Sequence, residues 1–418
     1  MKQILGIALL AFSILLAGCG GGSGGSTAPP ANVKLVPGDT SATVSWSQDS
    51  STEYWVWVAQ GNDTTTSNCA ATLACKIAVN VSSPFIITGL TDGTLYSVTV
   101  NARTGNGPGG PGSPPIAFVP RIAGTIWTAG APLTTANLLG LAFTVTTTAG
   151  VNTVIAVGAG GAIFYSPDAV NWVPETSNVS SNLNAATYAH SLFFAVGDAG
   201  TTLTSPDGGT WTAQVPQTKS NLYAVTNDGS GTIVAVGAGG TILVSTDGTT
   251  WAPANSHTSM DLYGIYNANG RYVAVGANGT ILTSTDAGQW TTINPTTSVN
   301  LRGVSNGASV ATATAAAAAT WVVVGDGGAL VTSPDGINWT EQLPITSINL
   351  TSVVHGTQFI AVGNAGAIFT SVDGLAWQPE ISETTRNLRA VTFTVLSAGS
   401  IGVGYVAVGG MGTNLSAF

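Results

Sequence analysis

The chain has 418 residues, of which 7% are charged, and its formal net charge is −9 at pH 7. With 10 lysines and arginines in all, it lacks the basic surface that a nucleic-acid backbone requires. Glycine is abundant, at 54 residues, and no stretch combines a sustained helical period with caps. The composition therefore predicts an all-β protein with almost no helix and no nucleic-acid partner.

Residues 1–19 form a predicted targeting segment. Lys2 gives a positive start, and the apolar run that follows is too short for an ordinary spanning helix. Leu16-Ala17-Gly18-Cys19 resembles a bacterial lipoprotein signal, which implies cleavage before Cys19 and lipidation of that residue. Gly20 resembles the outer-membrane sorting class, which implies a lipid-anchored protein of the cell envelope, on the periplasmic side or the cell surface. An uncleaved anchor is the alternative.

Residues 20–30 are a Gly/Ser/Pro linker, and residues 31–120 form a separate predicted β domain. About seven short runs in it alternate apolar and polar residues, which is typical of a sandwich. Val44-Ser45-Trp46, Gly89-Leu90 and Tyr96 make this domain resemble a fibronectin type III domain. The resemblance implies spacing or binding rather than catalysis.

Two cysteines, Cys69 and Cys75, lie in this domain. If Cys19 is consumed by lipid and the mature protein is exported, a local disulfide is predicted. A metal site is the alternative, but no histidine or acidic residue lies between the two cysteines.

Residues 121–418 repeat one pattern every 40 residues or so, which is typical of propellers and solenoids. A Val-Gly pair recurs at the repeat position in seven copies, but a polar hairpin ending in tryptophan follows only six of them. A further tryptophan of the same kind, Trp127, lies ahead of the first repeat. A ring accounts for this displacement, because a strand at the start of the domain can complete the last blade and remove free sheet edges. We therefore predict a seven-bladed β-propeller closed by its N- and C-terminal strands. An open solenoid is the alternative.

Each of the six hairpins carries a Ser-x-Asp sequence four residues before its tryptophan. Short Ser and Asp side chains accept hydrogen bonds from the turn's own N–H groups. The alternative is that the hairpin aspartates bind calcium, but one carboxylate per site supplies too few oxygen ligands. Neither a metal nor a cofactor is therefore predicted. The hairpin resembles a shortened Asp-box, and the domain is similar to Asp-box (BNR) propellers, most closely the Ycf48-like photosystem assembly propellers. The resemblance implies a structural role for Asp168, Asp207, Asp247, Asp286, Asp335 and Asp373.

The connection into each repeat ends in Asn or Asp followed by Leu, and the next residue varies from repeat to repeat. In a ring this position surrounds the mouth of the central channel, on the face opposite the hairpins. A varied position in a regular repeat is where a ligand preference is expected. The candidates are Asn184, Tyr223, Tyr263, Arg302 and Arg389. The alternative is that they only pack between blades or solvate the rim.

An Asp-box glycoside hydrolase, sialidase- or xyloglucanase-like, is the competing hypothesis. Such an enzyme needs two facing carboxylates, and Asp198 and Asp326 are the best pair outside the hairpins. The three histidines show no spacing typical of zinc ligation or a catalytic triad. We therefore predict a lipid-anchored binding or scaffold protein, leaning away from an enzyme, that recognises a protein or glycan at the channel mouth.

Overall fold

The computed structural model describes residues 27–70, 75–105, 109–145, 152–293, 297–308, 319–396 and 402–418. The predicted signal peptide, Cys19 and most of the linker lie outside these residues. The chain divides into two compact units, one containing Ser45–Ser83 and Leu95–Phe118, the other Leu35–Val44, Pro84–Thr94 and Val119–Phe418. The sequence boundary at residue 120 stays a prediction. No described helix is long and apolar enough to cross a membrane.

The first seven strands form two antiparallel sheets. One sheet has the order β1-β2-β5 and the other β4-β3-β6-β7. The strands are β1 (Lys34–Gly38), β2 (Ser41–Ser45), β3 (Thr52–Gln60), β4 (Lys76–Val81), β5 (Phe85–Thr88), β6 (Tyr96–Thr104) and β7 (Ile116–Phe118). The short helix α1 (Thr66–Ala70) contains Cys69, which forms a disulfide with Cys75, and the two Cα atoms are 5.2 Å apart.

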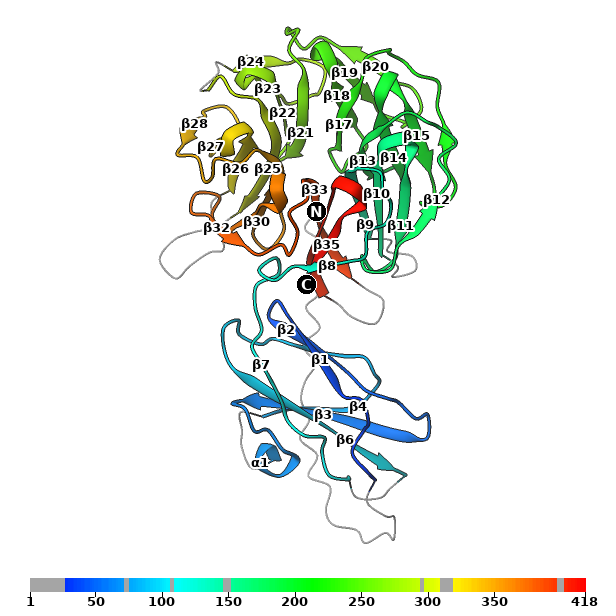
Figure 1. Ribbon diagram of the computed structural model, residues 1–418, viewed down its shortest axis with the longest axis vertical. Coiled ribbons are helices and arrows are strands. Elements are labelled where there is room, and N and C mark those ends of the chain that lie inside the picture. Colours follow the sequence, from blue (N-terminus) through cyan, green and yellow to red (C-terminus); the bar gives the residue numbers. More distant parts are fainter. Residues whose placement is uncertain are drawn as a thin grey trace, which may run out of the picture. The chain divides into compact units, whose positions relative to one another are not determined.

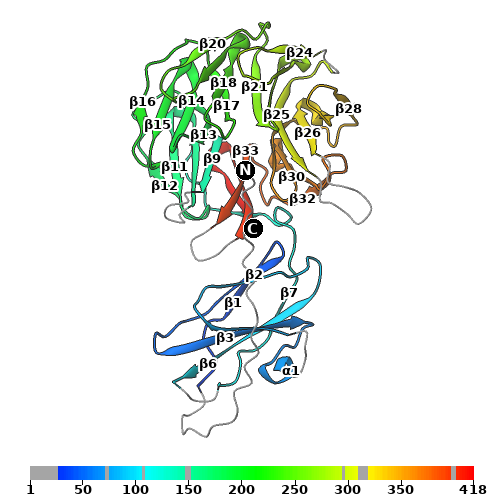
Figure 2. The same ribbon diagram turned by 180° about the vertical axis from the view of Figure 1, so that it is seen from behind.

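Seven four-stranded antiparallel sheets follow and are arranged as the blades of a ring (Figure 1). The innermost strands, which face the centre of the ring (Figure 2), are β9 (Leu138–Val145), β13 (Leu183–Ala189), β17 (Leu222–Asn227), β21 (Leu262–Ala268), β25 (Leu301–Ala308), β29 (Leu350–His355) and β33 (Leu388–Leu396). The second strands are β10 (Asn152–Gly158), β14 (Leu192–Gly197), β18 (Ile233–Gly237), β22 (Arg271–Gly276), β26 (Ala319–Gly325), β30 (Phe359–Gly363) and β34 (Gly402–Gly409).

A one-turn 3-10 helix joins each second strand to the third. The third strands are β11 (Ile163–Ser166), β15 (Thr202–Ser205), β19 (Ile242–Ser245), β23 (Ile281–Ser284), β27 (Leu330–Ser333), β31 (Ile368–Ser371) and β35 (Asn414–Ala417). The outermost strands of the first six blades are β12 (Val173–Glu175), β16 (Thr212–Ala213), β20 (Ala252–Ala254), β24 (Thr291–Ile293), β28 (Thr340–Gln342) and β32 (Gln378–Glu380).

The seventh blade takes its outermost strand from the start of the domain. β8 (Thr128–Ala129) pairs with β35 in the register Leu415↔Ala129 and Ser416↔Thr128 (Figure 1). Trp127 packs in the same cluster as Leu415, and its indole N–H donates to the Gly124 carbonyl, as the Trp211 indole does to Gly208. The predicted fold class, an all-β chain with a ring closed by both ends of the propeller, is confirmed.

The core of the ring lies between blades rather than in one central mass. Seven hydrophobic clusters are present in the described residues, and each combines residues of two consecutive blades. Leu138 and Val154 of the first blade, for example, pack with Val406 and Val408 of the last. Every blade is therefore stabilised from both sides, which is why a ring has no exposed end repeat.

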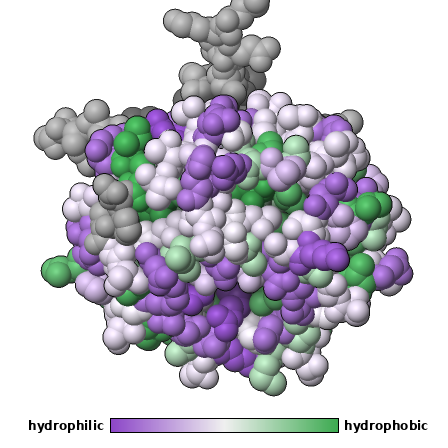
Figure 3. Space-filling model, turned by 90° about the horizontal axis from the view of Figure 1, so that it is seen from above, coloured by the Kyte–Doolittle hydropathy of each residue, from purple (hydrophilic) through white to green (hydrophobic). Residues whose placement is uncertain are grey.

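Small polar residues cover much of the surface. The face seen from above is mostly pale and purple, with green residues scattered over it (Figure 3). The most exposed large apolar side chains, Val215, Leu343 and Ile381, follow the outermost strands of three different blades. Apolar residues placed singly in this way are ordinary and identify no interaction surface.

Candidate functional site

Each inner strand is preceded by an Asn or Asp that joins two blades. Its backbone carbonyl accepts from the first residue of its own blade's 3-10 turn, at 2.8–3.0 Å. Its side-chain oxygen accepts from the middle residue of the preceding blade's turn, at 2.8–3.2 Å. The bond from the Met411 N–H to Asn137 closes the circle between the last blade and the first. We call these seven residues the cap residues: Asn137, Asn182, Asn221, Asp261, Asn300, Asn349 and Asn387.

The glycine of each Val-Gly pair is explained by this joint. A Cβ on Gly237 would overlap the carbonyl oxygen of Asn221, and the other six glycines meet their own cap residues in the same way. The backbone at these glycines is extended, so close approach rather than unusual dihedral angles selects glycine. The motif therefore marks where the second strand passes the start of the first.

The residue two positions after each cap residue lies in a β-bulge. The pairing between first and second strands shifts register there in all seven blades, so this residue has no partner in the ladder. A bulge re-aims its side chain, and bulges are common beside functional sites. We call these seven residues the mouth residues: Leu139, Asn184, Tyr223, Tyr263, Arg302, Thr351 and Arg389.

All seven mouth residues line one depression of about 380 Å³, together with Asp261. The depression opens onto a channel of about 510 Å³ lined by all seven inner strands. The five residues proposed from the sequence are thus brought together. Asp261 is the one residue of the depression that the sequence did not predict as part of the site or its varied position. The signal that could have found it is a carboxylate where the six other repeats carry asparagine.

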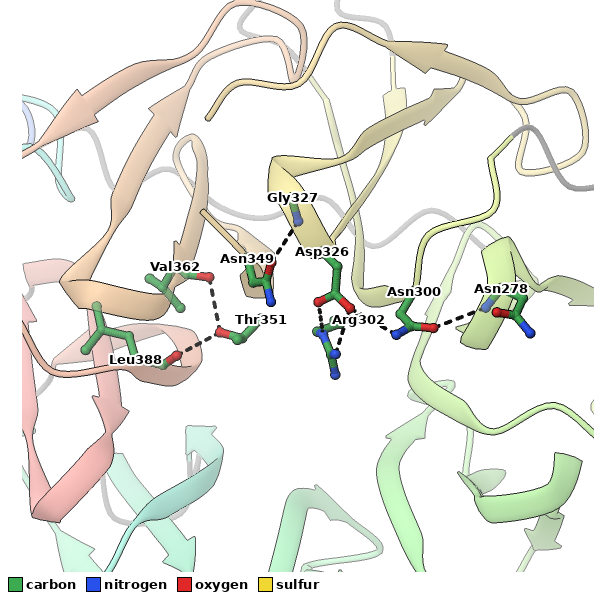
Figure 4. A network of polar contacts seen from close by, with 9 residues as sticks. All are labelled: Asn278, Asn300, Arg302, Asp326, Gly327, Asn349, Thr351, Val362 and Leu388. Carbon is green, nitrogen blue, oxygen red and sulfur yellow. Dashed lines mark hydrogen bonds and ion pairs between the residues drawn. The ribbon is translucent and has the colours of Figure 1, made fainter. Parts of the chain in front are cut away.

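In two blades, a carboxylate at the start of the 3-10 turn contacts the mouth residue of the same blade. In the fifth blade, the Asp326 carboxylate accepts hydrogen bonds from Nε and Nη2 of Arg302 at 2.5 and 2.8 Å. It accepts a third from Nδ2 of Asn300 at 3.0 Å (Figure 4). The Arg302 hydrogen bond holds the pKa of Asp326 below its usual range. In the second blade, the Asp198 carboxylate accepts hydrogen bonds from the side-chain amides of Asn182 and Asn184 at 2.8 and 2.9 Å.

An aromatic pair continues the row from Arg302. The Arg302 guanidinium carbon lies 5.3 Å from the centre of the Tyr263 ring, and that ring lies 5.7 Å from the ring of Tyr223. Burial, followed by the Asp261 charge, raises the pKa of Tyr263. Three consecutive blades therefore present one pre-organised polar and aromatic surface.

The remaining mouth residues differ in how they are held. Thr351 donates to the carbonyls of both Val362 and Leu388, which fixes its side chain (Figure 4). Arg389 is half-buried and forms no ion pair with any residue that the structure describes. Its guanidinium is therefore free to meet an anion from outside the chain.

The two carboxylates considered for glycoside hydrolysis are engaged in these contacts. A general acid needs a raised pKa, whereas Arg302 lowers that of Asp326. Within the described part of the chain, no three His, Cys, Asp or Glu side chains gather to hold a metal ion. The arrangement is suited to recognition through hydrogen bonds and stacking.

The six hairpin aspartates lie at the other end of the blades, where the third strands finish. Each carboxylate accepts the backbone N–H groups two and three residues ahead at 2.7–2.9 Å. None of them lines the depression at the mouth. Their oxygens are used within the turns.

Comparisons with known proteins agree with this architecture. Residues 28–119 match the family model of the fibronectin type III domain. The chain is similar to a solved structure of YCF48 bound to D1 peptide, with 20% identity, a TM-score of 0.54, and 70% of this chain and 94% of that chain covered. It is also similar to the WD40 β-propeller domain of Doa1, with 13% identity, a TM-score of 0.52, and 70% and 97% covered. No curated protein sequence matches the chain.

The chain is thus a fibronectin type III domain joined to a seven-bladed β-propeller.

Proposed function

We propose that this chain is a lipid-anchored scaffold of the cell envelope whose propeller binds a segment of a partner protein at the channel mouth. One observation carries the proposal. Seven bulged residues of five types (Leu, Asn, Tyr, Arg and Thr) line one depression, while the backbone joint beside each of them is the same in every blade. A site of that kind changes its specificity without changing its fold.

The similarity to a propeller solved with a peptide bound supports a protein partner. The aromatic pair and the free guanidinium of Arg389 are side chains typical of protein interfaces. The resemblance of the hairpins to Asp-boxes adds a structural role on the opposite face, which leaves the mouth for binding.

The test is capture of partners from an envelope extract by the wild-type chain and by Arg389→Gln. The matched control is Lys219→Gln, which removes the same charge from an exposed site on the propeller. We expect Arg389→Gln to lose most of the captured protein and Lys219→Gln to lose none. Equal capture by all three chains would remove the mouth as the binding site, and capture that survives protease treatment of the extract would indicate a glycan.

The lipid anchor rests on Leu16-Ala17-Gly18-Cys19, which lies outside the described residues. We expect cells fed a labelled fatty acid to label the wild-type chain, and Cys19→Ser to lose both the label and its place in the membrane fraction. A Cys19→Ser chain that stays in the outer-membrane fraction would contradict the anchor.

A further inference from the structure

Asp261 is the one cap residue that carries a charge. At the other six positions an asparagine both accepts a hydrogen bond through its oxygen and has a side-chain N–H to give. Asn182 and Asn300 donate theirs to Asp198 and Asp326, the first residues of their own blades' turns. The carboxylates in those two blades are therefore compensated from within the blade.

The fourth blade reverses this arrangement. Its turn begins with Ala277 instead of an aspartate, and the carboxylate stands at the cap position. One oxygen of Asp261 accepts the Gly239 N–H at 2.8 Å, which is the joint common to all blades. No described lysine, arginine or histidine forms an ion pair with Asp261. Its negative charge is presented to the depression without a counter-ion.

Two tyrosine rings stand beside this carboxylate. Tyr223 and Tyr263 line the same depression as Asp261, and their ring centres are 5.7 Å apart. Arg302 already lies over the ring of Tyr263, but Asp326 neutralises it. The aromatic faces and the uncompensated charge together favour a cation.

We propose that Asp261, Tyr223 and Tyr263 form a subsite for a primary ammonium group of the bound partner. The proposal rests on the proposed function, since it names the chemistry that the mouth recognises. The ammonium pairs with the free oxygen of Asp261 and lies against the tyrosine rings. A lysine side chain and a free amino terminus offer the same group.

The experiment uses the full chain labelled with 3-fluorotyrosine, with the fluorine signals of the two tyrosines assigned from Tyr223→Phe and Tyr263→Phe. The first probe is a blocked tri-lysine peptide, and its uncharged match is the same peptide acetylated on every side chain. The third probe is unblocked tri-alanine, whose only ammonium is its amino terminus. We expect tri-lysine to shift both signals and the acetylated peptide to shift neither. A shift by tri-alanine as well would extend the subsite to amino termini.

Asp261→Asn is the decisive variant, because asparagine occupies this position in the other six blades and keeps the bond to Gly239. We expect it to weaken tri-lysine binding at least about tenfold, a loss of about 1.4 kcal/mol. Asp198→Asn is the control: it removes a carboxylate that two asparagine amides compensate and that does not line the depression, so it should change binding less than about twofold.

Undiminished binding by Asp261→Asn, equal binding of the acetylated peptide, or wild-type signals unmoved at millimolar tri-lysine would each overturn the subsite. The titration needs no natural partner. A chain that binds tri-lysine through Asp261 but captures nothing from an envelope extract would contradict the proposed function alone.

Discussion

The two ends of each blade use the same residue types in opposite ways. At the hairpin end, six aspartates sit in six nearly identical turns, and each carboxylate accepts the N–H groups of its own turn. At the mouth end, the cap residues repeat the same joint seven times, but the bulged side chain beside each joint changes. A repeated frame with one varied position separates folding from recognition.

The fate of the carboxylates shows the difference most clearly. Asp247 is exposed, yet the Thr250 and Thr249 N–H groups hold its pKa well below its usual range. Asp326, beside the mouth residue Arg302, is held by that arginine, whereas Asp261 accepts one backbone N–H and forms no ion pair with any described residue. A carboxylate that is hydrogen-bonded within its own turn stabilises the blade, whereas a carboxylate without a charged partner is available to a ligand.

Breaking the closure of the ring should have the largest effect on both ends. Trp127 is 2% exposed and packs with Leu415 and Tyr405. Trp127→Ala removes this contact and should cost about 3–5 kcal/mol, lowering the Tm of the propeller by roughly 10 °C. Calorimetry of the full chain measures it, and Trp172→Ala, at a half-buried hairpin tryptophan, is the milder comparison. An unchanged Tm for Trp127→Ala would contradict the closure.

Breaking one joint between blades should come next. In Gly237→Ala the new Cβ meets the Asn221 carbonyl, which cannot move without shifting the strand. We expect a loss of about 2–3 kcal/mol in urea unfolding. Gly239→Ala is the control, because open space surrounds that position. Two other blades already carry alanine at the equivalent position of the turn, Ala199 and Ala365. The cost of Gly239→Ala should be about 1 kcal/mol, and equal losses for the two variants would refute the steric explanation.

The ring and its mouth could be predicted because both depend on patterns local to one repeat. The repeat of about 40 residues predicted the blades, and the displaced Trp127 predicted closure of the ring. The varied position after each Asn-Leu or Asp-Leu pair predicted the site residues Asn184, Tyr223, Tyr263, Arg302 and Arg389. The pairing of Arg302 with Asp326 could not be predicted in the same way. Those two residues are 24 positions apart, and only the folded joint brings a bulge and a turn together.

The same limit explains why Arg302 and Arg389 looked equivalent in the sequence. Both follow an Asn-Leu pair, but the turn of the fifth blade begins with Asp326, whereas the turn of the seventh begins with Gly410. One arginine is therefore compensated within its blade and the other is not. The charge balance of a mouth residue depends on the turn of its own blade, which the repeat alignment alone does not connect to it.

Acid should weaken the hairpin end before it affects the joints. Asp247, Asp286 and Asp335 all have pKa values lowered first by backbone N–H groups. Because these folded pKa values lie below those of the unfolded chain, their stabilisation is present above about pH 4 and is lost as the pH falls through the folded values. In Asp247→Asn, one carboxylate that takes up a proton on unfolding is missing. The dependence of its unfolding on pH, followed by tryptophan fluorescence, should therefore be less steep than in the wild-type chain. Identical acid transitions would contradict the role of the turn.

The smallest effect, and the sharpest contrast, is expected at the mouth itself. Arg302→Gln removes the charge that lowers the pKa of Asp326, while Asn300 still donates to that carboxylate. The Arg302 side chain is 33% exposed, so the loss in urea unfolding at neutral pH should be at most about 1 kcal/mol. The loss should disappear as the pH falls through the folded pKa of Asp326, because a protonated carboxyl no longer needs the arginine. Asp261→Asn should lose no stability at neutral pH, since that carboxylate forms no ion pair with any residue that the structure describes. If instead Asp261→Asn proved the more destabilising of the two, the Asp261 charge would be needed to stabilise the ring. The distinction between carboxylates that stabilise the fold and a carboxylate available to a ligand would then be wrong.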